Sequence, residues 1–267
     1  VEFTESKRDL TANDLTVTVP ENAVYDGLVH AATAALKTAD PQLTGAGQFT
    51  IKYQKKTGDT TWGDATTDAP KAAGTYKVLV SAEVGDNFNA TANDLDVSKQ
   101  FIIAPRPVTL VAASASKTFS GNPLKNDEFT VKEGTSFVSG EGVSVTMTAA
   151  STITDVGSVD NEIDDVTANE GTDLANYTIT KEKGTLTVTA AALTVTATAY
   201  EDVYDGEPHN ISYAVTDANE AEVTPDAVYF REGSSGEWIL AADFSLYTDV
   251  CTKTVQIKVS KANYADA

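Results

Sequence analysis

The sequence predicts an all-β protein built from three tandem copies of one small module. Apolar residues alternate with threonine in short runs such as Leu15–Val19, the pattern of an antiparallel sheet with one buried face. Three short motifs also recur in the same order three times along the 267 residues. Ordered recurrence of this kind indicates a tandem array rather than one large domain.

The first motif is an alternating strand followed by an aromatic residue, a small polar residue and glycine, which we call the aromatic turn. It occurs as Leu15–Val19 with Tyr25-Asp26-Gly27, Val108–Ala112 with Phe119-Ser120-Gly121, and Leu193–Ala197 with Tyr204-Asp205-Gly206. The aromatic positions lie 94 and 85 residues apart. Each copy is therefore about the size of a small independent domain.

Two further motifs follow each aromatic turn. A tight turn into a strand, the strand-start turn, occurs as Ala73-Gly74-Thr75 before Tyr76–Val80, as Thr154-Asp155-Val156-Gly157, and as Thr248-Asp249-Val250-Cys251. An asparagine followed by an aromatic residue, the Asn-aromatic corner, occurs as Asn87-Phe88, Asn176-Tyr177 and Asn263-Tyr264. Three motifs in register three times indicate one common fold for all copies.

The first and third copies are the closer pair. Both read Tyr-Asp-Gly-x-x-His, ending at His30 and His209, and both place a tryptophan after a polar turn, whereas the second copy has Leu124 at the histidine position. The Ala-rich segment from His30 to Leu36 looks helical by propensity. It aligns with the alternating segment His209–Val215, so we predict that both segments are strands.

We predict module boundaries at residues 1–104, 105–190 and 191–267, with residues 1–14 as a leader or a neighbour's edge. Closing strands are expected at Leu95–Ile103 and at Tyr177–Val188, the latter continuing through Lys183-Gly184. The third module ends three residues past Tyr264, so we expect it to lack its final strand. Three explanations are open: the chain is truncated, a further segment supplies the strand, or Val1–Leu10 belongs to a neighbour's edge. An unpaired edge of this kind invites strand addition.

The joints between modules are short. Ala104-Pro105-Arg106-Pro107 and Ala190-Ala191-Ala192 contain no flexible Gly/Ser linker, and proline fixes φ. We therefore expect an elongated rod of three immunoglobulin-like β-sandwich modules, with a β-grasp-like arrangement as the alternative, because the alternation does not fix strand order.

The charge excludes several classes of partner. With 39 acidic and 19 basic residues the net charge is -20, which disfavours nucleic acid and direct membrane contact because both require basic residues that neutralise phosphates. Cys251 is the only cysteine, so no internal disulfide or cysteine-based zinc site is expected. We expect a monomer with no cofactor.

Several of these motifs together support a family comparison. Tyr25-Asp26-Gly27, Tyr204-Asp205-Gly206, Asn176-Tyr177 followed by Thr185–Val188, and Thr154–Ser158 resemble the YDG-type and MBG-type tandem repeats of bacterial surface adhesins. The resemblance covers nearly the whole chain from Leu15 and implies an extracellular protein, secreted or anchored to the cell wall or surface. It also implies an adhesive or spacer role without catalysis. The second copy departs from it at Phe119-Ser120-Gly121.

The repeated motif residues are interpreted as structural. They are Tyr25, Asp26, Gly27, His30, Phe119, Gly121, Tyr204, Asp205, Gly206 and His209. Asp and Gly form turns and an aromatic ring can seal the end of a core. The two histidines occupy equivalent positions of distant modules, so they cannot share a metal ion, and we expect each to form local hydrogen bonds.

Trp62 and Trp238 are the candidate ligand contacts. Each follows a polar turn, where an exposed ring can stack on a sugar or, as commonly, cover the end of a small sandwich. A carbohydrate- or mucin-binding module, with host or microbial glycans or proteins as partners, is therefore the alternative function.

No catalytic or metal site is predicted. The acidic stretch from Asp160 to Asp165 offers oxygen ligands for calcium but lacks the spacing and central glycine of an EF-hand loop, so we expect a solvated acidic loop. Cys251 is taken as a packing residue. An isopeptide cross-link between a lysine and an Asn or Asp is a further possibility. No nucleophile, phosphate loop or carboxylate pair in the sequence indicates an enzyme.

Overall fold

The chain is all-β, as the sequence predicts. The computed structural model describes residues 1–38 and 43–267. Two compact units are present: unit 1 comprises Val1–Leu110, Val131–Ser144 and Val166–Lys181, and unit 2 comprises Val111–Thr130, Val145–Asp165 and Glu182–Ala267. Both units therefore draw on the second copy of the repeat.

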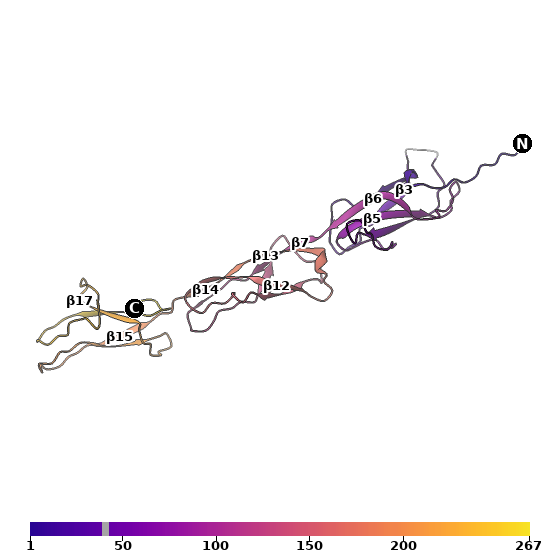
Figure 1. Cartoon of the computed structure of the whole chain (residues 1–267). Helices are drawn as coiled ribbons and strands as arrows, with labels where there is room; N and C mark the ends of the chain where they lie inside the picture. The colour runs from indigo at the N-terminus through magenta and orange to yellow at the C-terminus, as the bar shows by residue number, and fades with distance from the viewer. Residues whose placement is uncertain (39–42) are drawn as a thin grey trace. The chain divides into compact units, whose positions relative to one another are not determined.

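Unit 1 begins with two sheets. A 3-10 turn, η1 (Ala12–Asp14), leads into β1 (Leu15–Thr18), which pairs antiparallel with β3 (Thr33–Leu36). The second sheet has the order β2-β6-β5-β4 and consists of β2 (Ala23–Val24), β6 (Leu95–Ala104), β5 (Gly74–Ala82) and β4 (Phe49–Lys55). Residues of β1 contact β6 and residues of β3 contact β4, so the small sheet packs on the larger one (Figure 1).

The alternation of the sequence explains this packing. Leu15 and Val17 of β1 are buried while the threonines between them are exposed. On β5, Val78 and Val80 are fully buried, and the rings of Tyr76 and Phe101 stack with centroids 5.6 Å apart. Together these side chains form the core between the two sheets. The Ala-rich segment is thus a strand from Thr33 onward, which confirms the sequence prediction.

Unit 1 also contains much of the sheet β13-β7-β9. Its strands are β13 (Tyr177–Glu182), preceded by the 3-10 turn η2 (Leu174–Asn176), β7 (Arg106–Ala112) and β9 (Phe129–Val131). Only Pro105 separates β6 from β7. The paired strands β10 (Val143–Met147) and β12 (Ile163–Ala168) have residues in both units.

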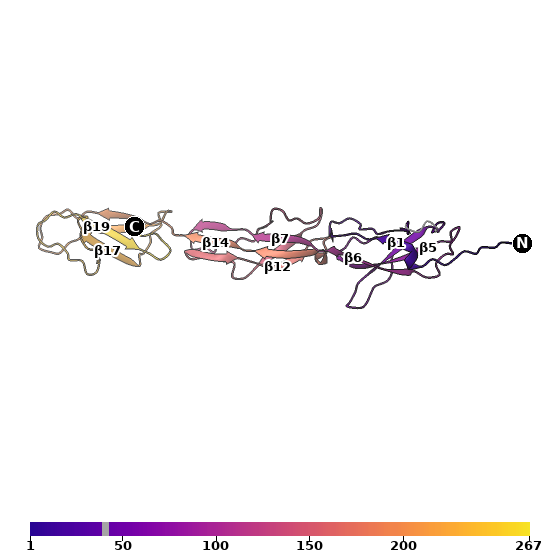
Figure 2. The same ribbon diagram turned by 90° about the horizontal axis from the view of Figure 1, so that it is seen from above.

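Unit 2 contains three sheets. In the first, β14 (Gly184–Thr189) lies between β11 (Gly157–Asn161), which is antiparallel to it, and β8 (Ala115–Thr118), which is parallel. β15 (Thr194–Thr198) pairs with β16 (Ser212–Thr216). In the third sheet β17 (Ala227–Glu232) lies between β18 (Ile239–Leu240) and β19 (Val255–Ser260), and Figure 2 shows β17 and β19 side by side.

Two expectations about the second copy are wrong. The closing strand is not continuous, because the chain leaves one sheet at Glu182 and enters another at Gly184. The acidic stretch is not a loop but the end of β11 and the start of β12. Asn161 explains this second result: it is fully buried and its Nδ2 donates to the carbonyl oxygens of Ala113 and Asn126, at 2.8 and 2.9 Å.

Candidate functional site

The glycine of the aromatic turn has the same conformation in all three copies. Gly27, Gly121 and Gly206 have φ values of 79°, 73° and 80°, in the left-handed region that glycine enters without steric cost. The carboxylates of Asp26 and Asp205 each accept the backbone N–H two residues later, at 2.9 Å. These bonds fix the turn and set the position of the aromatic residue before it.

Each histidine bonds to the aspartate of its own aromatic turn. His30 Nε2 lies 3.2 Å from Asp26 Oδ1, and His209 Nε2 lies 2.9 Å from Asp205 Oδ1. The His209 bond is the main cause that lowers the pKa of Asp205. The His209 ring also stacks on Tyr200 with centroids 4.1 Å apart. Both histidines are therefore engaged locally, each within its own copy.

In unit 1 the aromatic turn of the first copy contacts the second copy. Tyr25 and Tyr177 are each 7% exposed, and their rings meet edge to face at 5.4 Å. Both hydroxyls donate to one carboxylate, Tyr25 to Glu141 Oε1 and Tyr177 to Glu141 Oε2 at 2.7 Å. Phe137 packs on Tyr177 at 4.9 Å. The result is an aromatic cluster with a shared charged acceptor at its edge.

The other two motifs meet at the same place. The N–H of Ala73, in the strand-start turn of the first copy, donates to Asn176 Oδ1 at 2.8 Å, and Asn176 is only 6% exposed. Gly27 also lies against the second copy, because a Cβ added there would be 2.8 Å from a methyl carbon of Val138. In unit 1 the aromatic turn, the strand-start turn and the Asn-aromatic corner therefore converge on one contact.

Unit 2 repeats this contact between the second and third copies. The rings of Phe119 and Tyr264 meet edge to face at 5.6 Å. The N–H of Val156 donates to Asn263 Oδ1 at 2.8 Å, and Asn263 Nδ2 donates to Asp155 Oδ1 at 2.9 Å. The same three motifs thus supply the same pair of interactions, an aromatic contact and an asparagine that accepts a backbone N–H.

Comparison of the three copies within the sequence found these motifs but did not predict that they form contacts between copies. It treated the aromatic ring as a seal for its own copy, whereas the ring meets the Asn-aromatic corner of the next. Glu141 and Val138 were missed altogether. Neither residue belongs to one of the three repeated motifs, so the search for repeats gave no signal for them.

The shared carboxylate changes the ionisation of both phenols. The hydrogen bond to Glu141 is the main cause that raises the pKa of Tyr25 to about 12. Burial first, and then the bond to Glu141, raises the pKa of Tyr177 to about 12. Both effects favour the neutral phenol, because a phenolate here would face a carboxylate in a poorly hydrated site.

Unit 1 is therefore expected to lose stability in alkali. In the unfolded chain both phenols ionise near pH 10, whereas the folded unit keeps them neutral until about pH 12. Their contribution is fully present below pH 10 and is lost as the pH rises towards 12. Melting temperatures measured from pH 8 to 12 should fall less steeply for the double variant Tyr25→Phe, Tyr177→Phe. Identical slopes would contradict the assignment.

Trp62 and Trp238 are half-buried, and each has a cation over its ring. Lys77 Nζ is 5.3 Å from the centroid of Trp62, and Arg231 Cζ is 4.4 Å from that of Trp238. Lys258 also approaches Trp238, at 5.5 Å. These cation–π contacts occupy ring surface that a sugar would need for stacking.

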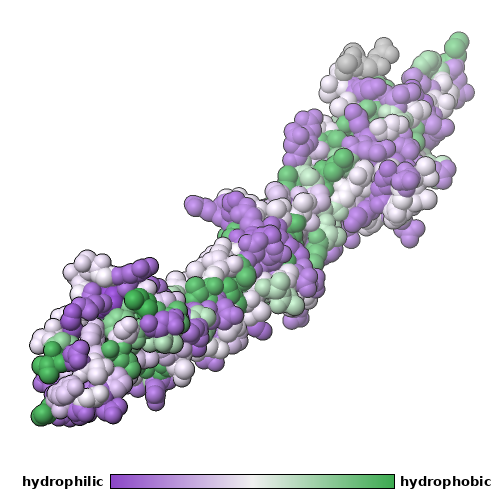
Figure 3. All heavy atoms as spheres, turned by 60° about the vertical axis from the view of Figure 1, so that its left-hand side comes forward, coloured by the Kyte–Doolittle hydropathy of each residue, from purple (hydrophilic) through white to green (hydrophobic). Residues whose placement is uncertain are grey.

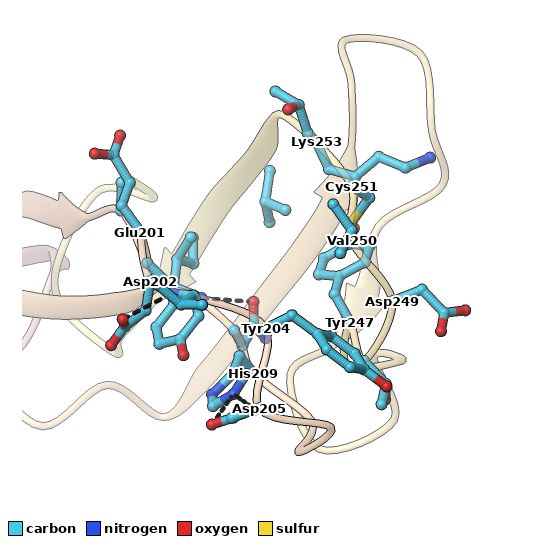
Figure 4. A pocket seen from close by; sticks show the side chains of 18 residues that line it. Glu201, Asp202, Tyr204, Asp205, His209, Tyr247, Asp249, Val250, Cys251 and Lys253 are labelled. Atoms are coloured by element: carbon cyan, nitrogen blue, oxygen red, sulfur yellow. Dashed lines mark hydrogen bonds and ion pairs between the residues drawn. The ribbon is translucent and has the colours of Figure 1, made fainter.

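The aromatic turn of the third copy borders an open hollow of about 550 Å³ (Figure 4). Tyr200, Tyr204, His209, Tyr247 and Cys251 are among the residues that line it. Cys251 is exposed, so the expectation that it is a packing residue is wrong. In Figure 4 its side chain lies apart from the His209 ring, whose Nε2 bonds to Asp205. A thiol activated by an imidazole is therefore not assembled at this hollow.

Two residues of the acidic stretch are paired with one lysine. Asp160 and Glu162 both form ion pairs with Lys183 and raise its pKa. Across residues 1–38 and 43–267, no three His, Cys, Asp or Glu side chains are grouped closely enough to hold a metal ion. In the same described residues, no helix is long and apolar enough to cross a membrane.

A scan against protein-family models gives no match, and a search of curated proteins gives none either.

Proposed function

We propose that this chain is a structural or adhesive stalk segment of a bacterial extracellular surface protein, without catalytic activity. In this proposal the three copies are immunoglobulin-like β-sandwiches of the YDG or MBG type, stacked end to end as a monomeric rod. The observation that carries it is the contact made by the three repeated motifs. Tyr25 with Tyr177, and Phe119 with Tyr264, join successive copies in the same way.

Such contacts suit a stalk because they limit bending between copies. An asparagine that accepts a buried N–H and an aromatic pair each restrict rotation, and the joint through Pro105 is too short to act as a flexible linker. The charge of -20 opposes association between chains. On the face drawn in Figure 3, apolar residues form small clusters that are separated by hydrophilic residues.

Glycan binding through Trp62 and Trp238 is the second candidate. The two tryptophans occupy equivalent places in the first and third copies and are only half-buried. Partial access is what a sugar-stacking ring requires. The cations over both rings make this function the weaker proposal.

Small-angle scattering of the 267-residue chain, paired with a glycan and mucin screen, tests the stalk proposal. Three copies end to end, each about 30 Å long, should give a maximum dimension of roughly 90 Å or more. The Trp62→Ala, Trp238→Ala double variant should match the parent in both measurements. A compact scattering profile would contradict the stalk, and glycan retention that the double variant loses would favour the second candidate.

A further inference from the structure

The aromatic turn of the third copy is uncovered, unlike its equivalents. Tyr25 is 7% exposed and Phe119 is half-buried, whereas Tyr204 is 63% exposed. The strand-start turn shows a graded difference at the second residue of its bend: Ala73 is 7% exposed, Val156 is 44% exposed and Val250 is 86% exposed. The third copy thus presents both groups that the first two copies use to contact the next copy.

The glycine of the turn shows the same contrast between the first and third copies, whereas Gly121 of the second copy has no atom within 4 Å of an added Cβ. A Cβ at Gly27 would meet Val138 of the following copy at 2.8 Å. At Gly206 the nearest atom is 3.8 Å away and belongs to Tyr204 of the same turn. The surface that Val138 covers in the first copy is therefore open in the third.

A closing strand positions the aromatic residue in both earlier copies. The Tyr25 N–H donates to the carbonyl of Ala104 at the end of β6, and the Phe119 N–H donates to that of Thr189 at the end of β14, at 2.9 and 2.8 Å. Each turn is preceded by a short strand parallel to that closing strand. In the third copy β19 is the edge of its sheet, the position from which a closing strand would reach Tyr204.

The geometry points to this end of the third copy as an acceptor for the Asn-aromatic corner of a further copy of the repeat, joined in the same polypeptide. The incoming asparagine oxygen would accept the Val250 N–H, and the incoming ring would meet Tyr204 edge to face. The closing strand that leads to this copy would pair with β19. This inference rests on the proposed role of the repeats as an array.

A tethered copy is the occupant that the charges favour. Two separate chains of net charge -20 repel each other, whereas a covalently joined copy is held at high effective concentration. The second copy is the matched partner, because it already docks on the first copy, and the first and third copies share the Tyr-Asp-Gly turn.

The test is an extended chain in which a second copy of Asp96–Ala190 follows Ala267. The strand register supports this junction. Ala267 exchanges two backbone hydrogen bonds with Val259 of β19, and Leu95 holds the same place opposite Val80 of β5. Both valines are fully buried and precede a serine. Amide exchange at Val250 should slow about tenfold or more relative to the 267-residue chain. Alkylation of the exposed Cys251, next to Val250, should slow with it.

Two variants of the appended copy make the result specific. Asn176→Ala in that copy should return Val250 to fast exchange, whereas Asn122→Ala, at an exposed asparagine of the same copy, should leave the protection intact. Protection of the appended Leu186 amide reports that the copy has folded. An appended copy that stays unfolded, or that folds while Val250 exchanges as before, would overturn the proposal.

Self-association is the competing occupant. If Val250 of the unextended chain became protected as its concentration rose, a second molecule rather than a tethered copy would be the partner, and the proposal would be wrong. Scattering of the unextended chain tests the stalk separately. A compact profile there would reject the stalk without affecting the exchange rate measured at Val250.

Discussion

Replacing Glu141 with alanine is expected to lower the stability of unit 1 by about 2–3 kcal/mol. The change removes two hydrogen bonds to a charged acceptor, each of which contributes about 1.5–3 kcal/mol, although water can replace part of this. It also leaves the hydroxyls of Tyr25 and Tyr177, both 7% exposed, without their shared acceptor. The contact between the first and second copies should therefore open more often.

Thermal melting and amide exchange measure this effect. The melting midpoint of the transition that reports unit 1 should fall by about 4–12 °C. Exchange at Ala73 should become faster because its bond to Asn176 belongs to the same contact. Glu133→Ala, at an exposed glutamate of unit 1, is the matched control and should change neither measurement. Equal losses from the two variants would show that the Glu141 bonds contribute nothing specific.

Gly184→Ala is expected to destabilise unit 2 by about 1–3 kcal/mol. Gly184 is buried at the start of β14, where a Cβ would lie 2.5 Å from the carbonyl oxygen of Ala112 and 2.6 Å from that of Ala113. Backbone atoms cannot rotate away as a flexible side chain can. Relief of the clash would therefore shift the pairing of Gly184 with Asn161 and disturb the carbonyl bonds of that buried side chain.

Gly63→Ala provides the control for this substitution. The nearest atoms to a Cβ at Gly63 are 3.5 Å away, an ordinary van der Waals distance. Denaturant unfolding followed by circular dichroism should separate the two variants, with a lower midpoint for Gly184→Ala only. Equal midpoints for both would mean that the close approach at Gly184 relaxes without cost.

The strands and their copies could be predicted from sequence because they depend on local patterns. Alternation placed Leu15 and Val17 on a buried face, and alignment between copies corrected the helical propensity around Thr33–Leu36. Prediction failed for the acidic stretch, where composition suggested a loop. The buried Asn161 holds that stretch in the sheet through carbonyls 48 and 35 positions away, and no local pattern reveals such partners.

The sequence by itself determined that three motifs recur in order and that Asp and Gly form the aromatic turn. Only the tertiary structure decided that these motifs belong to a contact between successive copies. Tyr25 and Glu141 are 116 positions apart, and Ala73 and Asn176 are 103 apart. Periodicity reports which residues are equivalent, but it does not report which copy an exposed ring or N–H will meet. That depends on how the end of one copy packs against the start of the next.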